Sequence, residues 1–216
     1  MTATEIVEAC QELAERGWVA NHDGNISIRR PRDGFLVTPT AFRKRDVRAV
    51  DLLVIDDDGA VRQGRHRVFS EWHLHRSVYQ ARSDARAVVH AHPPFATSMA
   101  CAGRQLDPSF MAEALVSLGP EIGWVPFEKP GATALGLAVQ SVSQRCHAAL
   151  LGQHGVLAWG SDLTMAMCRL ELVEQLARIV VTSAPLGGVK SLPQPVVRQL
   201  VEKHVGAGLA APGVKL

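Results

Sequence analysis

The sequence has little net charge, no long apolar run and no basic leader segment, and each absence excludes a class of protein. Its 23 lysines and arginines face 21 aspartates and glutamates, so the net charge of +2 gives no reason to expect a nucleic-acid or membrane partner. No run of about 18 apolar residues occurs, so no segment is predicted to span a bilayer. The first residues carry no basic region ahead of an apolar segment, which is unlike a secretion signal and predicts a cytoplasmic protein.

Cysteine is sparse as well. Four cysteines occur with no Cys-x-x-Cys spacing, so we expect reduced packing residues rather than a disulfide framework.

A chain of 216 residues that is 47% hydrophobic and 20% charged predicts one globular domain over residues 1–216. Its end, Gly206 to Leu216, is rich in glycine, alanine and proline, so we expect a mobile tail there unless a partner subunit holds it.

The hydrophobic pattern mixes helical periods with short alternating or continuous apolar runs. Because hairpins are frequent among the strands, we expect an α/β fold with a mixed, largely antiparallel sheet and helices on both faces. The predicted helices cover residues 4–17, 71–82, 109–119, 132–146 and 162–183, the last with Ser161 or Asp162 as its N-cap. The predicted strands cover residues 26–29, 34–38, 52–55, 87–91, 122–125, 148–151 and 156–159.

Two histidines stand at the end of an apolar run, in the stretch Val88-Val89-His90-Ala91-His92-Pro93-Pro94. Side chains two residues apart on a strand point to the same face, so His90 and His92 project together. Two imidazoles placed this way can chelate one metal ion. The prolines cannot continue a central strand, which puts the pair at the strand's end.

A metal site needs a further ligand, and His154 is the best candidate. Gly152 and Gly155 flank it and let the backbone turn sharply between two strand-like segments. The alternative is an ordinary turn histidine in solvent. His73 and His75 also form a His-x-His pair, but they lie on a predicted helix, where residues two apart do not face each other.

Glu71 follows Ser70 at the predicted start of a helix. Ser70 is a good N-cap and an acidic first turn suits the helix dipole, so local structure explains Glu71 completely. The functional alternative is a carboxylate beside the metal that moves a proton on and off the substrate.

Small polar residues cluster near the ends of the predicted strands, in Gly24-Asn25-Ile26-Ser27 and in Thr38-Pro39-Thr40. Together with Ser70 they offer backbone N–H groups and hydroxyls to a phosphate or similar anion. In isolation such clusters are usually only turns.

Taken in order, these motifs resemble the class II aldolase/adducin family, and most closely its members of the L-fuculose-phosphate aldolase type. The matching elements run from Gly24-Asn25-Ile26-Ser27 through Thr38-Pro39-Thr40, Ser70-Glu71 and His90-Ala91-His92-Pro93 to Gln153-His154-Gly155. The resemblance implies that three histidines bind a divalent metal, usually Zn²⁺, and that Glu71 is the catalytic acid/base. These ligands are His90, His92 and His154. It further implies that the substrate phosphate is held by Gly24, Asn25, Thr38, Thr40 and Ser70.

The resemblance also implies a single-domain three-layer αβα sandwich and a cytoplasmic homotetramer with sites at subunit interfaces. Its implied activity is that of a lyase of carbohydrate metabolism, a zinc-dependent aldolase that cleaves the C3–C4 bond of a small ketose phosphate or related hydroxy-ketone. The metal would stabilise an enediolate in that reaction. Glu71, where epimerase relatives typically carry Asp, favours aldol cleavage. The alternatives are a dehydratase, decarboxylase or epimerase using the same enediolate, and a non-catalytic interaction domain such as the adducin head.

Two residues depart from the pattern of these aldolases. Phe69 stands where they carry the first of two serines, which removes a phosphate hydrogen bond of about 1.5–3 kcal/mol unless the anionic group itself differs. Phe69 is alternatively a strand residue that faces the core. Phe110 stands where they carry a tyrosine, and the chain's single tyrosine is Tyr79. The proton donor to the leaving aldehyde is therefore water, a histidine or another group.

Overall fold

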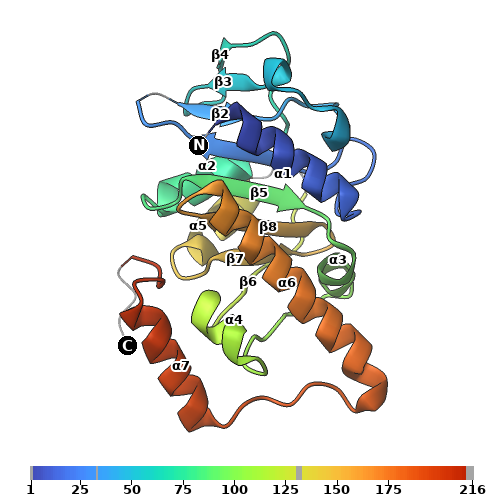
Figure 1. Ribbon diagram of the computed structural model, residues 1–216, viewed down its shortest axis with the longest axis vertical. Helices are drawn as coiled ribbons and strands as arrows, with labels where there is room; N and C mark the ends of the chain where they lie inside the picture. Colours follow the sequence, from blue (N-terminus) through green and yellow to red (C-terminus); the bar gives the residue numbers. More distant parts are fainter. Residues whose placement is uncertain (1, 33, 130–132, 213–216) are drawn as a thin grey trace.

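The strands pair into one sheet whose centre is β5, flanked by β1 and β8 (Figure 1). The computed structural model describes residues 2–32, 34–129 and 133–212. Within them the sheet has eight strands in the order β4-β3-β2-β1-β5-β8-β7-β6, and each described pair is antiparallel except β6 with β7. The strands are β1 (Asn25–Arg29), β2 (Phe35–Val37), β3 (Leu53–Ile55), β4 (Val61–Gln63), β5 (Ala87–Ala91), β6 (Gly123–Val125), β7 (Ala148–Leu151) and β8 (Gly155–Gly160).

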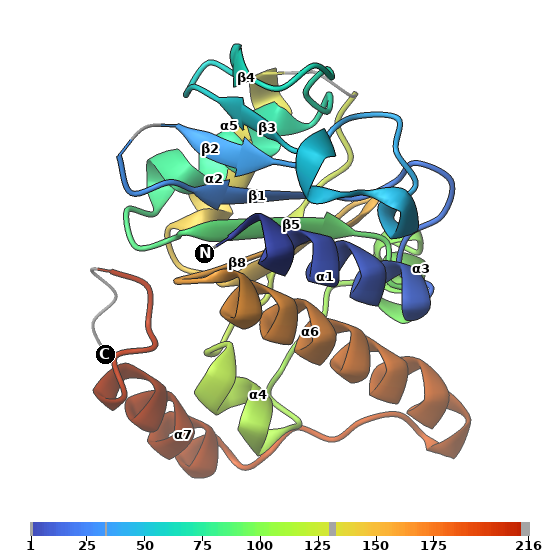
Figure 2. The same ribbon diagram turned by 45° about the horizontal axis from the view of Figure 1, so that its top comes forward.

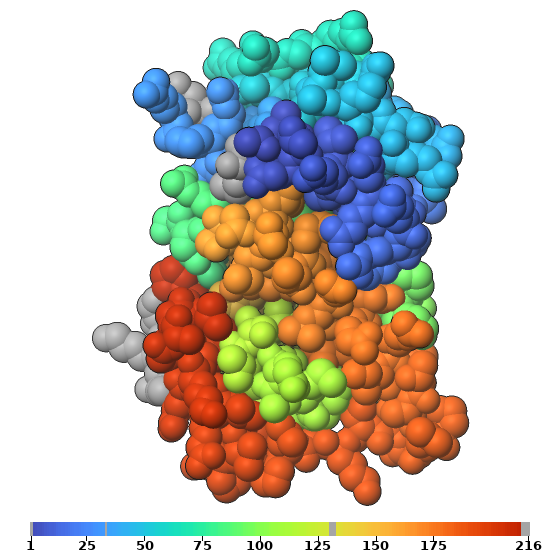
Figure 3. All heavy atoms as spheres, viewed as in Figure 1, coloured from blue at the N-terminus to red at the C-terminus, as the bar shows by residue number. Residues whose placement is uncertain are grey.

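Helices cover both faces of this sheet (Figure 2). Those in the described residues are α1 (Ala3–Glu15), α2 (Trp72–Ala81), α3 (Pro94–Cys101), α4 (Ala112–Ser117), α5 (Thr133–Ser143), α6 (Leu163–Ser183) and α7 (Gln194–Gly206). One face carries α1, α3 and α6, and the other carries α2 and α5. Figure 3 shows α6 between α1 and α4 on the first face, with α7 beside α4. The predicted αβα sandwich with a mixed, largely antiparallel sheet is confirmed.

Strand β5 is buried on both faces, which explains its nearly continuous apolar sequence. Val89 packs in the layer of α1, α3 and α6, whereas Val88 packs in the layer of α2 and α5. Because side chains alternate along a strand, His90 is directed to the same side as Val88. The candidate metal ligand therefore faces the α2 side of the sheet.

Side-chain caps fix the starts of two helices. Thr2 and Glu5 form a capping box at the start of α1. Asp162 caps α6 by accepting a hydrogen bond from the backbone N–H of Met165 at 2.7 Å, as predicted. Helix α6 then buries residues three or four apart against the sheet, among them Ala166, Leu170 and Val173.

Several element boundaries differ from the sequence-based expectation. Helix α2 begins at Trp72, so Ser70 is not its N-cap, and α4 and α5 are shorter than predicted. Three elements were not predicted. Helix α3 is only eight residues long and starts within a double proline, α7 starts at a Pro-x-Pro sequence, and all three residues of β4 are exposed. Helix α3 and strand β4 are too short to show a sustained apolar period, whereas α7 has one, in Val197, Leu200 and Val201, that the prediction overlooked.

The four cysteines are all free. Cys10 and Cys146 are buried packing residues as predicted, but Cys101 and Cys168 are exposed, so the prediction of packing roles is wrong for these two. Of the predicted tail, the part through residue 212 is described, and Ala211 in it is 3% exposed; residues 213–216 lie outside the described residues. Among the described helices, none combines the length and the apolar composition that a membrane crossing requires.

Replacing Gly24 with alanine should destabilise the fold more than replacing Gly17. Both glycines have positive φ, +70° and +69°, but a Cβ at Gly24 would lie 2.6 Å from Val19 and 2.9 Å from the His90 carbonyl oxygen, whereas nothing lies within 4 Å of one at Gly17. We expect G17A to lower the free energy of unfolding by about 1 kcal/mol and G24A by about 2–3 kcal/mol. Urea unfolding of both variants measures the difference. Equal losses would contradict the close approach of Gly24 to β5.

Candidate metal centre and active site

The antiparallel register of the central strands gathers the predicted site residues at one edge of the sheet. Asn25 on β1 lies directly opposite His90 on β5, and Leu157 on β8 lies opposite His90 on the other side. His154 occupies the tight connection between β7 and β8. Because β8 pairs with β5 from Val156 onward, this connection delivers His154 to the end of β5, where His92 leaves the strand.

His90 is fully buried, and its Nδ1 lies 2.9 Å from the carbonyl oxygen of Val156. A carbonyl can only accept, so Nδ1 carries the proton and Nε2 keeps its lone pair. Burial lowers the pKa of His90 to about 4, against the opposing attraction of Glu71. His90 is therefore neutral near pH 7, which is the form that ligates metals.

His92 is oriented in the same way by a carboxylate. Its Nδ1 lies 3.3 Å from Oδ2 of Asp23, and its backbone N–H donates to the carbonyl of Trp18 at 2.8 Å. Burial lowers the pKa of His92. A carboxylate behind an imidazole fixes the ring and raises its basicity, which is the usual surroundings of a metal-bound histidine.

The ligand nitrogens of His90, His92 and His154 all lie within 4.8 Å of one another. The Nε2 atoms of His90 and His92 are only 3.0 Å apart. Since the Nδ1 atoms hold the protons, two lone pairs meet there and repel unless a cation lies between them. Two nitrogens about 2.0–2.1 Å from a tetrahedral Zn²⁺ are roughly 3.3 Å apart, so the donor set fits a divalent metal.

Glu71 stands beside this cluster. Its carboxylate accepts a hydrogen bond from the Asn25 amide at 2.8 Å and lies 2.9 Å from Nε2 of His154 and 3.6 Å from Nε2 of His90. Burial would raise the pKa of Glu71, but the hydrogen bonds from His154 and from the Asn25 amide outweigh it and hold the pKa below its usual range. The carboxylate is thus ionised.

The explanation of Glu71 from local helix structure is wrong. Glu71 occupies the N-cap position of α2, but its side chain makes no capping hydrogen bond. The carboxylate turns toward Asn25 and His154, on segments distant in the sequence. Only the tertiary structure makes these contacts visible.

A cavity of about 410 Å³ opens beside Glu71 and His154. Ser70 and His73 also line it, and the rest of its wall is largely apolar. That apolar part comes from Leu74, Pro126, Phe127, Leu135 and Leu151. The cavity therefore joins a polar, metal-competent end to a wall suited to carbon atoms of a small molecule.

Two of the three segments predicted to bind phosphate, 38–40 and the one that ends at Ser70, lie side by side. A β-bridge joins Pro39 to Val68, and the backbone N–H of Thr40 donates to the carbonyl of Arg67 at 3.0 Å. Ser70 is exposed and lines the cavity. Thr38 is fully buried, and its hydroxyl accepts from the backbone N–H of Ile26 at 3.1 Å. Of the five residues predicted to bind phosphate, Ser70 lines the cavity, whereas Gly24, Asn25, Thr38 and Thr40 are not part of its wall.

The two phenylalanines that depart from the aldolase pattern both pack in apolar surroundings. Phe69 is 5% exposed and its ring centroid lies 4.9 Å from that of His75, in the core between α2 and the sheet. Phe110 is half-buried and packs against the core on the opposite face. Phe69 is therefore a core residue.

Sequence reasoning missed three residues near the site. Asp23 lies in the loop before β1, and nothing in the sequence pairs it with His92. Lys44 is buried, and its ammonium donates to the carbonyls of His22 and Phe42, which ties that loop to the segment after Thr40. His75 lies on α2 and is fully buried.

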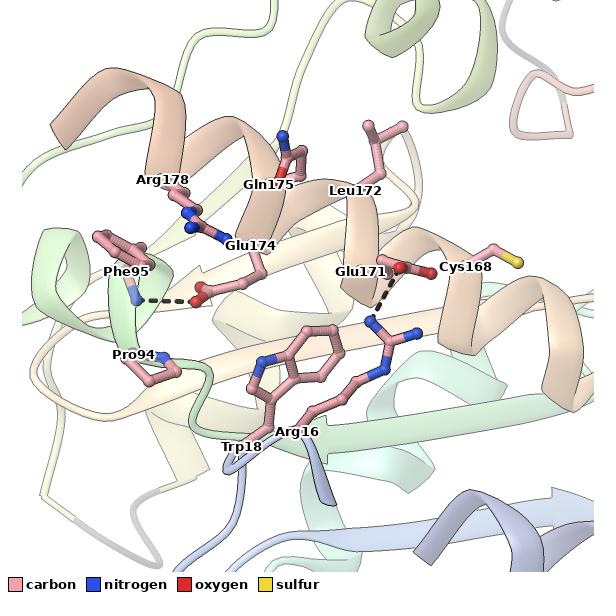
Figure 4. Close-up of a pocket in the computed structure, with 10 residues that line it drawn as sticks. All are labelled: Arg16, Trp18, Pro94, Phe95, Cys168, Glu171, Leu172, Glu174, Gln175 and Arg178. Atoms are coloured by element: carbon pink, nitrogen blue, oxygen red, sulfur yellow. Dashed lines mark hydrogen bonds and ion pairs between the residues drawn. The ribbon is translucent and has the colours of Figure 1, made fainter. Parts of the chain in front are cut away.

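A larger hollow, about 620 Å³, lies on the other face of the sheet between α1, α3 and α6 (Figure 4). Its charged groups are already engaged: Arg16 pairs with Glu171 at 2.8 Å, and Glu174 accepts from the backbone N–H of Phe95 at 3.0 Å. Glu174 thereby holds the start of α3, directly after His92. None of the clustered histidines lines this hollow.

The chain belongs to the family described as the class II aldolase and adducin N-terminal domain, whose model matches residues 4–181. Over 92% of its length it is 30% identical to a 5-methylthioribulose-1-phosphate/5-deoxyribulose-1-phosphate aldolase of Rhodospirillum rubrum, covering 88% of that protein.

Solved structures agree with the family assignment. An L-fuculose 1-phosphate aldolase superposes with a TM-score of 0.85 at 26% identity, over 94% of this chain and 95% of that one. YgbL of Klebsiella pneumoniae, for which aldolase, epimerase and decarboxylase are the candidate activities, superposes with a TM-score of 0.84 at 28% identity, over 93% of this chain and 99% of that one. The predicted resemblance to the family is confirmed.

Proposed function

We propose that this chain is a divalent-metal-dependent aldolase that makes or cleaves the C3–C4 bond of a small ketose phosphate. The observation that carries the proposal is the convergence of three imidazoles and one ionised carboxylate, two of which, His154 and Glu71, line a cavity. The relationship to sugar-phosphate aldolases supports it. Zn²⁺ is the metal that best suits three histidines.

The protein's own residues prepare the metal end of the site. His90, His92 and His154 would hold the metal, with the first two oriented by the Val156 carbonyl and by Asp23. A divalent metal bound there supplies Lewis-acid stabilisation of negative charge on the substrate oxygens.

Glu71 would move the proton at carbon. In the synthetic direction its ionised carboxylate removes a proton from the hydroxylated carbon of a three-carbon keto phosphate, and that carbon then bonds to the aldehyde carbon. In cleavage the C3–C4 bond breaks, the aldehyde leaves, and Glu71 returns the proton to C3. The Asn25 amide holds one carboxylate oxygen in place throughout.

The proton on the aldehyde oxygen needs a separate carrier. Neither Phe110 nor Tyr79 lines the cavity, and the Tyr79 hydroxyl is bonded to Ser27. His73 does line the cavity, with its Nδ1 bonded to the carbonyl of Ser70 at 3.2 Å. We assign this proton to His73 or to a water molecule next to it.

The substrate phosphate would lie where the segments 38–40 and 67–70 adjoin. Ser70 offers its hydroxyl at the cavity wall, and Thr40 and Asn25 stand on neighbouring segments. Thr38 and Gly24 would act by shaping the backbone around β1. A cytoplasmic homotetramer with sites at subunit interfaces remains part of this proposal.

The similarity to YgbL favours one second candidate, an epimerase or decarboxylase with the same metal ligands. Product analysis distinguishes the two. The zinc-loaded protein is offered short aldehydes together with dihydroxyacetone phosphate, dihydroxyacetone or pyruvate, and the products are identified by NMR. A new carbon–carbon bond supports the aldolase, and its absence with every pair contradicts it. A non-catalytic, adducin-like domain would instead bind no metal.

We expect the purified protein to hold about one divalent metal ion per chain. Replacing Asp23 with asparagine should weaken metal affinity about 10–100-fold, because the carboxylate that orients His92 is lost. Competition with a chromophoric chelator measures the affinity. D58N is the matched control, since Asp58 pairs with Arg76 on the surface. Equal affinities for D23N and D58N would contradict the role of Asp23.

Replacing Glu71 with glutamine should leave the metal bound and lower aldol turnover by at least about 10²-fold, because the amide cannot accept the proton from carbon. Metal analysis and steady-state kinetics test the two parts. E121Q serves as a control, because Glu121 pairs with Arg145 away from the cavity. Undiminished turnover in E71Q would contradict the proposed role of Glu71 as the acid/base.

A further inference from the structure

Helix α2 and strand β1 face each other through polar side chains at matched spacing. Four residues of helix advance about 6.0 Å and two residues of strand about 6.6 Å, so helix positions four apart can stay level with strand positions two apart. We call the resulting set the polar ladder. Its members are Asn25, Ser27 and Arg29 on β1, Glu71 at the N-cap position directly before α2, and His75 and Tyr79 on α2.

Each level of the ladder is hydrogen-bonded. At the top, the Asn25 amide donates to Glu71 at 2.8 Å. In the middle, the Ser27 hydroxyl lies 2.7 Å from Nδ1 of His75 and 2.8 Å from the Tyr79 hydroxyl, which itself donates to the Ser27 carbonyl at 2.9 Å.

At the bottom, Arg29 donates to the carbonyl of Tyr79 at 2.6 Å, and its guanidinium carbon lies 4.9 Å from the Tyr79 ring centroid. Hydrogen bonds at three successive levels fix the position of α2 along the direction of β1.

The middle level is fully inside the protein. Ser27 and His75 have no exposed surface and Tyr79 is 4% exposed. Burial, with a contribution from His90, lowers the pKa of His75 to about 3, so the imidazole is neutral. Directional bonds between neutral buried groups define a register, which apolar packing alone specifies less sharply.

Glu71 depends on that register. It precedes the first residue of α2 and makes no capping bond, so its carboxylate is located by Asn25 and His154. Strand β1 is in turn paired with β5, with Asn25 opposite His90 and Ser27 opposite Val88. The Ser27–His75 hydrogen bond thus sets the position of the start of α2 relative to β5, the strand that carries His90.

We propose that Ser27 and His75 are positioning residues which, through the polar ladder, set the place of the Glu71 carboxylate beside His90. This inference rests on the proposed role of Glu71 as the acid/base. Loss of the middle level lets α2 shift along β1 and lengthens the contact between Asn25 and Glu71. The proton transfer at carbon then slows while the fold and the metal ligands stay in place.

Exchange of the carbon-bound protons of dihydroxyacetone phosphate with D₂O, followed by NMR, measures the proton transfer alone. In zinc-loaded H75L we expect exchange about 10–100-fold slower, because small displacements of a catalytic group have effects of this size. The KM for dihydroxyacetone phosphate and the metal content should not change. H75N, which keeps a hydrogen-bonding atom near Ser27, should recover most of the rate. If H75L does not fold, S27A replaces it, because it removes the Ser27 hydroxyl from the same bond and should slow exchange in the same way.

The matched control is H147L. His147 is 2% exposed and precedes β7, at the end of the sheet away from the clustered histidines. The folded control should exchange at the wild-type rate. In addition, S27A and H75L combined should lose little more than the larger single effect, because they remove the same bond.

Wild-type exchange in folded, metal-loaded H75L, or an equal loss in H147L, would overturn the proposal. If the wild-type protein itself shows no exchange, the proposed function fails instead. Crystal structures of H75L and H147L then decide on the ladder, since the distance between Asn25 and Glu71 should lengthen only in H75L. An unchanged distance in H75L would overturn it.

Discussion

The pairing of β5 with β1 on one side and β8 on the other is the constraint on which the site depends. Three antiparallel strands bring Asn25, His90 and the turn that holds His154 to a single edge of the sheet. The strands are held by backbone hydrogen bonds and packed on both faces by helices, so the groups they carry have little freedom to move apart. The side chains at this edge therefore keep nearly fixed positions relative to one another.

That rigidity is used to hold groups that repel one another. Burial keeps the imidazole of His90 neutral, and its Nδ1–H donates to the Val156 carbonyl. Its Nε2 atom, which carries a lone pair, lies 3.0 Å from Nε2 of His92. The ionised carboxylate of Glu71 lies beside His90 and His154. An electron-rich cluster of this kind is unfavourable by itself and would be stabilised by a cation, so metal binding there would raise the stability of the fold.

The sequence predicts the parts of the site that obey a local period. His90 and His92 follow from strand alternation, and His154 from its flanking glycines. Glu71 was explained locally as a helix-dipole residue, because its partners Asn25 and His154 are distant in the sequence. Asp23 behind His92 and the Ser27–His75 bond depend on how strands and helices are set side by side, which no residue spacing specifies. The missed elements α3, β4 and α7 are short, exposed or opened by proline.

The walls of the cavity and its reactive end come from different segments. Phe127 is 57% exposed in the connection after β6, and Leu135 belongs to α5, whereas the histidines come from β5 and the β7–β8 turn. Substitutions in the connection and in α5 can therefore reshape the space for the carbon chain while leaving the ligands untouched. Such a division lets one reactive centre be adapted to different molecules by changes in surface segments alone, with little cost to the folding of the sheet.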